Sequence, residues 1–177
     1  MKTKLSAVVS DFDDTLFLIN DCIRAASLEI LGKQMDLEEV KKKDKETKRK
    51  VYYLAHDKYW DKAVPNTAVI NYVKTMQASG YDIIVLSAKG EEHRLITERM
   101  LSSVGIKYKD VILPKDHSTS DEKWKLDEFN KLLGRYSNLV ALEDKKENID
   151  YILSSIEPKK IEFYYINKGE IKRYTRS

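Results

Sequence analysis

Most of the residues that could carry out chemistry in this sequence stand where an apolar run ends or a helix begins. They form four clusters, which are Asp11, Asp13 and Thr15; Ser87, Ala88 and Lys89; Lys123 and Lys125; and Glu143 and Asp144. Open parallel sheets bind ligands at the carboxyl ends of their strands. If the apolar runs are such strands, carboxylates, a hydroxyl and a lysine converge on one edge of the sheet.

The crowded carboxylates indicate a metal ion, because they repel one another and a divalent cation relieves that repulsion. His56, His93 and His117 are scattered without metal-ligand spacing, although His117 falls on a loop that could reach the site. Oxygen ligands without a histidine or cysteine cluster favour Mg²⁺ over zinc or copper. A cation, a lysine and a hydroxyl together suit a phosphoryl group, whose transfer depends mainly on positioning and charge stabilisation.

The apolar pattern predicts an α/β fold, a Rossmann-like parallel sheet flanked by helices on both faces. Strands are expected at 5–10, 82–87, 110–113 and 139–142, with a terminal hairpin or an extended last strand at 161–166 and 171–174. Helices are expected at 20–31, 67–79, 91–104, 121–133 and 148–155, and one or two more within 36–60. The whole of 1–177 is expected to be one domain.

The segment 17–64 departs from this alternation, since it is too long for one crossover helix and too polar for a core. We expect a small helical cap inserted over one edge of the sheet. Within it, residues 41–50 hold seven basic and two acidic side chains, a net charge of +5. Such a run is usually a solvated helix face, but above a phosphate site it could attract a polyanion. Tyr52, Tyr53, Tyr59 and Trp60 follow it, and they suit either the cap core or stacking on nucleobases.

The overall composition excludes several classes of protein. The 177 residues carry a net charge of only +3 and a single cysteine, Cys22, so neither a histone-like polycation nor a disulfide framework is expected. No run reaches the roughly 20 apolar residues of a membrane span. A cytoplasmic protein without a membrane partner is the expectation, and the sequence does not indicate its oligomeric state.

The four clusters and their flanking residues resemble the motifs of the haloacid dehalogenase (HAD) superfamily. DFDDTL resembles its D-x-D-x-T-L signature, and IIVLSAKG, KWKLDEFNKLL and VALEDKKEN resemble its second, third and fourth motifs. All four occur in the family's order across about residues 5–150. The spacing and the lysine segment are also similar to the phosphatase domains of nucleic-acid repair enzymes. Each motif alone could be a solvated turn or a helix cap, so the interpretation rests on the set.

The resemblance implies a phosphatase and assigns a role to each matching residue. Asp11 would be the nucleophile that forms an aspartyl-phosphate, and Asp13 would protonate the leaving oxygen and later activate water. Asp144 would hold Mg²⁺ together with the Asp11 carboxylate and the Asp13 backbone carbonyl. Thr15 would steady the loop, and Ser87 would donate a hydrogen bond to the phosphate.

The sequence departs from the family's pattern at two places. Where many relatives have Thr-Gly-Arg, this chain has Ser87-Ala88-Lys89, so Lys89 would replace an arginine that helps to hold the substrate. Asn148 stands where an aspartate is common, which leaves fewer charges around the metal. Glu143 and Asn148 are expected to lie just outside the metal ligands, with Glu143 near the catalytic lysine.

Two lysines compete for the catalytic position in the third motif. Lys125 is favoured because Phe129, Leu132 and Leu133 follow it at the spacing of a buried helix face. Lys123 has Leu126 at +3 but Asp127 at +4, and it is kept as a second phosphate-binding candidate.

Other functions remain open beside the phosphatase. A phosphomutase is compatible with the motifs, whereas dehalogenases of the superfamily usually lack the second aspartate, which is present as Asp13. A catalytically silent member that binds a phosphorylated ligand or a protein is opposed by the intact motifs. A kinase has no support, because no G-x-x-x-x-G-K loop occurs. The expected substrate is a small-molecule phosphate ester or a nucleic-acid end, with a nucleotide or nucleic-acid end favoured over a sugar phosphate.

Overall fold

The computed structural model describes residues 5–157 and 159–175. Its main sheet has six strands in the order β5-β4-β1-β6-β7-β8. They are β1 (Ser6–Ser10), β4 (Asp82–Leu86), β5 (Asp110–Ile112), β6 (Asn138–Glu143), β7 (Ile161–Asn167) and β8 (Glu170–Arg173). The first five in this order pair in parallel, and β8 turns back along β7 as an antiparallel hairpin. The predicted α/β fold with a parallel sheet is therefore confirmed.

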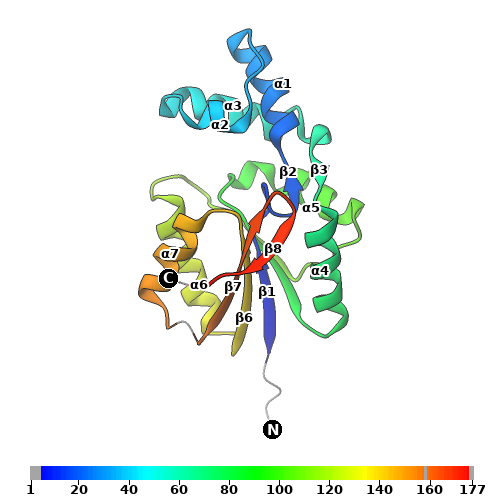
Figure 1. The fold of residues 1–177 in the computed structure, drawn as a ribbon, viewed down its shortest axis with the longest axis vertical. Coiled ribbons are helices and arrows are strands. Elements are labelled where there is room, and N and C mark those ends of the chain that lie inside the picture. The colour runs from blue at the N-terminus through cyan, green and yellow to red at the C-terminus, as the bar shows by residue number, and fades with distance from the viewer. Residues whose placement is uncertain (1–4, 158, 176–177) are drawn as a thin grey trace.

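Two pairs of helices cover the two faces of the sheet (Figure 1). They are α4 (Thr67–Ala78) and α5 (Arg94–Ser103) on one face, and α6 (Asp121–Leu133) and α7 (Lys146–Ser155) on the other. Successive residues of a strand point to opposite faces. Val8 accordingly packs in the core beneath α4 and α5, whereas its neighbour Val9 packs in the core beneath α6 and α7.

The helices lie where the sequence predicts them, with small differences at their ends. The predicted helix 91–104 begins as a short 3₁₀ helix, η2 (Glu91–His93), before α5. The polar stretch 36–60 contains two α-helices, α2 (Leu37–Lys41) and α3 (Lys45–Asp57), and enters the 3₁₀ helix η1 (Trp60–Lys62). Asp36 and Asp44 cap α2 and α3, since their side chains accept hydrogen bonds from backbone N–H groups of the first turn.

The segment 17–64 stands above the edge of the sheet at which β1 ends (Figure 1). It starts and finishes in a two-stranded antiparallel ribbon, β2 (Phe17–Leu18) with β3 (Val64–Pro65), which was not predicted. Between these strands, α1 (Asn20–Leu31), α2 and α3 enclose a small core of their own, to which Cys22 belongs. We call this segment the cap. Its C-terminal end is anchored because the Asn66 side chain donates a 2.9 Å hydrogen bond to the Thr15 carbonyl.

Among the described residues, no helix combines the length and the hydrophobicity that crossing a membrane requires.

Candidate active site

Asp11 is held at the carboxyl end of β1, between β4 and β6. Its backbone N–H donates a 2.9 Å hydrogen bond to the Leu142 carbonyl, which continues the β1–β6 pairing by one residue beyond β1. Its carboxylate Oδ1 accepts a 2.8 Å hydrogen bond from the Phe12 backbone N–H. The side chain is 9% exposed, so the carboxylate is nearly buried and keeps a little access to solvent.

Lys125 is the lysine that reaches Asp11. Its Nζ lies 3.1 Å from Asp11 Oδ2 and 2.7 Å from Glu143 Oε2, and the residue is only 2% exposed. Phe129 and Leu132 lie four and seven residues further along α6 and are buried in the core. Lys125 therefore lies on the buried face of the helix, as its spacing from these two residues predicts. Lys123 is exposed on the same helix, away from this group of charges. Of the two candidate lysines, the structure brings Lys125 and not Lys123 to the site.

The carboxylates around Lys125 are under electrostatic strain. Burial, together with the charges of Glu143 and Asp13, raises the pKa of Asp11 to about 7, although Lys125 acts in the opposite direction. Burial and the charges of Asp11 and Glu143 raise the pKa of Asp144 to about 9. Glu143 is buried as well, but its contact with Lys125 outweighs burial and lowers its pKa. Lys125 thus favours the charged form of Glu143, whereas burial and the neighbouring carboxylates still disfavour the charged forms of Asp11 and Asp144.

These carboxylates fit a hard divalent cation. One oxygen from each of Asp11, Glu143 and Asp144 lies within 4.8 Å of the others. Both oxygens of Glu143 are already engaged, one by Lys125 and the other by the Lys145 backbone N–H at 3.1 Å. Asp144 Oδ1 is buried and has no hydrogen-bond partner among the described residues. An unpartnered buried carboxylate oxygen beside Asp11 is what a cation with oxygen ligands would use.

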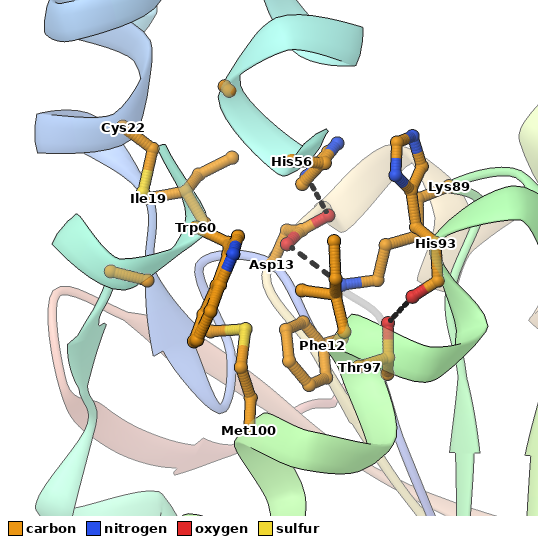
Figure 2. Close-up of a pocket in the computed structure, with 13 residues that line it drawn as sticks. Phe12, Asp13, Ile19, Cys22, His56, Trp60, Lys89, His93, Thr97 and Met100 are labelled. Carbon is orange, nitrogen blue, oxygen red and sulfur yellow. Dashed lines mark hydrogen bonds and ion pairs between the residues drawn. The ribbon is translucent and has the colours of Figure 1, made fainter. Parts of the chain in front are cut away.

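Asp13 lies between two positively charged or ionisable side chains (Figure 2). Its Oδ2 is 3.0 Å from Nε2 of His56, which comes from the cap, and its Oδ1 is 3.5 Å from Nζ of Lys89, which follows β4. Burial alone would raise the pKa of Asp13, but His56 and Lys89 together lower it below its usual range. The Lys89 ammonium also lies 3.3 Å from the centre of the Phe12 ring. At 3.5 Å the Lys89 contact is a loose ion pair and not a well-formed hydrogen bond.

The remaining predicted site residues lie on the same edge of the sheet. Ser87 is buried directly after β4, where its backbone N–H donates to the Ile112 carbonyl at 3.2 Å, and Ala88 is half-buried next to it. Thr15 is fully buried, and its hydroxyl has no hydrogen-bond partner within the described part of the chain. Asn148 is buried in the first turn of α7, and its side-chain nitrogen has no such partner either.

The sequence did not single out the histidine that the structure brings to the site. His117, which falls on a loop that could reach the site, is exposed. His56 instead contacts Asp13, and the ring of His93 lies 5.3 Å from the ring of His56. His56 sits next to Ala55, which is buried in the cap core, so helical periodicity shows only that it lies near the buried face of α3. Nothing in the spacing indicates that this face meets the loop after β1.

The sheet order, the cap position and the acidic site define a HAD-like fold, which solved structures share. A chain of the Pnkp1/Rnl/Hen1 RNA repair complex is 21% identical with a TM-score of 0.64, and the match covers 96% of this chain and 45% of that one. A HAD hydrolase, family IA, variant 3 from Entamoeba histolytica HM-1:IMSS is 15% identical with a TM-score of 0.59, covering 90% and 82%. A hydrolase from Streptococcus pneumoniae TIGR4 is 11% identical with a TM-score of 0.59, covering 93% of both chains.

This chain spans about half the length of the chain from the RNA repair complex. A family model described as "Protein of unknown function (DUF2608)" matches residues 2–132, and the chain belongs to that family. No curated protein matches the sequence.

Proposed function

We propose that this protein is a Mg²⁺-dependent phosphatase that hydrolyses a phosphate monoester through an aspartyl-phosphate on Asp11. The observation that carries the proposal is the Asp11 carboxylate, fixed at the carboxyl end of β1 with Lys125 at 3.1 Å. Beside it lies Asp144 Oδ1, which has no hydrogen-bond partner among the described residues. A carboxylate nucleophile, a buried cation and a place for a divalent metal are the groups that phosphoryl transfer requires.

The residues suggest a reaction in two steps. In the first, an Asp11 oxygen attacks phosphorus, the bond from phosphorus to the ester oxygen breaks, and Asp13 gives its proton to the leaving oxygen. In the second, water attacks phosphorus, Asp13 takes a proton from that water, and Asp11 and inorganic phosphate are released. Lys125 and Ser87 would bind phosphoryl oxygens. Mg²⁺, held by Asp11 and Asp144, would neutralise charge on the phosphoryl group.

Asp13 must exchange a proton in both steps. The ionised form, which His56 and Lys89 favour in the structure, is the form that the second step uses. A substrate phosphate bound next to Lys89 would draw this cation from Asp13 and would oppose the negative charge on Asp13. Both effects favour the protonated form that the first step uses.

Chelation is the direct test of the metal. We expect phosphate release from a chromogenic phosphate ester to stop after treatment with a chelator and to return with Mg²⁺ or Mn²⁺. Added Ca²⁺ should inhibit, because its larger and more flexible coordination shell misplaces Asp11 relative to phosphorus. The measurement is initial rate against metal concentration, together with the thermal unfolding temperature with and without metal.

The outcomes separate the competing functions. Full activity after exhaustive chelation would contradict the metal requirement. Transfer of the phosphoryl group between positions of a sugar phosphate, without release of inorganic phosphate, would identify a mutase. Binding of phosphorylated compounds with no turnover, across a panel of metabolites, nucleotides and phosphorylated oligonucleotides, would identify a silent member.

The geometry of the cap favours a nucleic-acid end as substrate. Residues 7 and 11 positions apart lie within about 20° of each other around a helix. Arg49 and Lys45 therefore lie on the same side of α3 as His56, roughly 10 and 17 Å from it along the axis. Both are exposed, and neither forms an ion pair with any described residue. Tyr53, exposed on the same side of the helix, adds a ring on which a base could stack.

A strand whose terminal phosphate lay at Asp11 could thus extend along a basic face of α3. This choice agrees with the likeness to a chain of an RNA repair complex, which by itself shows only the fold. It also agrees with the exposure of most of the run 41–50, in which Thr47 and Lys48 are half-buried and, of the basic residues, only Lys41 and Lys50 form ion pairs within the described part of the chain, with Glu38 and Glu46.

Charge reversal tests this substrate class. In the double variant Lys45→Glu and Arg49→Glu, we expect KM for an oligonucleotide 3′-phosphate to rise about tenfold or more and its salt dependence to flatten. Hydrolysis of a small chromogenic ester should change little. The matched control, Lys42→Glu with Lys43→Glu, alters the net charge equally but lies before α3, so its effect should be clearly smaller. Equal effects on both substrates, or a panel led by a sugar phosphate, would make this run an ordinary solvated surface.

A further inference from the structure

The cap brings one side chain into contact with the candidate acid–base residue. His56, in the last turn of α3, places Nε2 3.0 Å from Oδ2 of Asp13, which is within ion-pair distance, while Nε2 forms no hydrogen bond of standard geometry within the described part of the chain. The two residues are 43 positions apart in the sequence and belong to the cap and to the loop after β1. Their side chains are 12% and 21% exposed, so the contact is shielded from most of the solvent.

The Asp13 carboxylate has two polar side-chain contacts among the described residues, and the contact with His56 is the shorter of them. The other is Lys89, which approaches the opposite oxygen at 3.5 Å and at the same time lies over the Phe12 ring. With His56 removed, the loose ion pair with Lys89 would be the one polar contact left to the Asp13 carboxylate among the described side chains. A general acid must be aimed at the leaving oxygen to within hydrogen-bond distance, so its orientation matters as much as its presence.

The position of His56 depends on how the cap is docked. On the cap side, Val51 and Ala55 are fully buried and fix α3 against α1. On the core side, the ring of His93 from η2 lies 5.3 Å from the ring of His56 and 5.2 Å from that of Tyr53. The core residue His93 thus lies against Tyr53 and His56 of α3, so the cap contacts the core next to His56.

A cavity opens beside this contact, between the cap and the core (Figure 2). Its volume is only about 10 Å³, room for about one water molecule, and its lining includes Asp13, His56 and Lys89 on the polar side and Phe12, Trp60 and Met100 on the apolar side. A leaving group that takes a proton from Asp13 has to occupy the space next to this carboxylate. The cap therefore forms one wall of that space and also supplies a partner of the acid.

We propose that His56 is a positioning residue: it orients the Asp13 carboxylate for proton transfer to the leaving group, so that the acid–base step is complete only when the cap is docked. The inference rests on the proposed phosphatase function. It assigns to the cap a part in the chemistry, in addition to covering the site. His56 acts through Asp13 and needs no contact with the phosphoryl group.

The test compares two leaving groups. Phenyl phosphate depends on protonation of its leaving oxygen, whereas p-nitrophenyl phosphate releases a stable anion and depends on it little. In His56→Ala, we expect kcat/KM for phenyl phosphate to fall about tenfold to a hundredfold and kcat/KM for p-nitrophenyl phosphate to fall less than about threefold. The ratio kcat/KM is the right quantity, because it covers the steps up to departure of the leaving group and excludes the later attack of water.

Three further variants define the role. His56→Gln keeps an N–H donor of similar reach and should restore most of the activity toward phenyl phosphate. In the background of Asp13→Asn, His56→Ala should cost little more, since the two side chains act as one unit. His117→Ala, which removes an exposed histidine, should leave both substrates unchanged. Retained hydrolysis of p-nitrophenyl phosphate shows that the His56 variant is folded.

The possible failures can be told apart. No hydrolysis of either ester by the wild-type protein in Mg²⁺ would overturn the proposed function and, with it, this inference. If the wild-type protein is active, three results would overturn the inference alone. His56→Ala could lower kcat/KM for both esters equally, lower it for neither, or lower it in the Asp13→Asn background by as much as in the wild type.

Discussion

Replacing Asp11 with asparagine should abolish phosphate release while the fold survives. An amide has no anionic oxygen to attack phosphorus, and no other carboxylate occupies the position between Lys125 and the end of β1 among the described residues. We expect kcat/KM to fall at least about 10³-fold, the scale on which loss of a nucleophile acts. Initial rates with a chromogenic ester in saturating Mg²⁺ measure the effect.

The same substitution should not weaken the protein in the absence of metal. Burial and neighbouring charges raise the pKa of Asp11 to about 7 in the folded protein, above the 3.8 of a free side chain. A carboxyl with a raised pKa costs stability as it ionises, and the penalty grows as the pH rises from the unfolded value through the folded value. At pH 8 without metal, Asp11→Asn should therefore unfold at the same temperature as wild type or higher.

An exposed carboxylate provides the control for this experiment. Asp21 lies in the first turn of α1 and is solvent-exposed, so Asp21→Asn should keep both activity and unfolding temperature. Activity of Asp11→Asn within tenfold of wild type would contradict the assignment of the nucleophile.

The second large effect concerns the two lysines of α6. Lys125→Met should lower kcat/KM about 10²- to 10³-fold, because a buried cation 3.1 Å from the nucleophile stabilises charge that develops in the transition state. Lys123→Met is the matched control, two positions before Lys125 and on the exposed side of α6. It should change kcat/KM less than about twofold, since a solvated charge contributes little. The reverse order would show that the wrong lysine has been assigned.

Lys125→Met also has a predictable effect on stability, which must be separated from catalysis. The substitution leaves Asp11 and Glu143 buried without their cation. Removing one partner of a buried ion pair lowers the free energy of unfolding by about 3–5 kcal/mol. Adding Glu143→Gln removes one of these charges and should recover part of the free energy of unfolding, measured with a denaturant. Activity should stay low in the double variant, because the cation at Asp11 is still missing.

Much of the fold could be predicted from the sequence because its signals are local. The valine-rich run before Asp11 has the composition of a buried strand, and the structure forms β1 there. Gly32 ends α1 as expected, with a φ of 67° that a glycine adopts without strain. The spacing of Phe129 and Leu132 from Lys125 indicated which lysine points inward, since a helix repeats every 3.6 residues.

The ribbon of β2 and β3 had no such signal. Two residues are too few to show the alternation of a strand, and the pairing of Phe17 with Pro65 joins segments 48 positions apart. The same limit applies to η1, a 3₁₀ helix of three residues.

By itself, the sequence determined that acidic groups, a lysine and a serine meet at the carboxyl ends of parallel strands, because each follows its own strand or helix at a fixed offset. Only the tertiary structure decided how these groups divide their contacts. Lys125 bridges Asp11 and Glu143, and one oxygen of Asp144 has no hydrogen-bond partner in the part of the chain that the structure describes. Only the tertiary structure, too, brought His56 to Asp13, because that contact depends on the angle at which the cap packs on the core, and this angle is set by many distant side chains together.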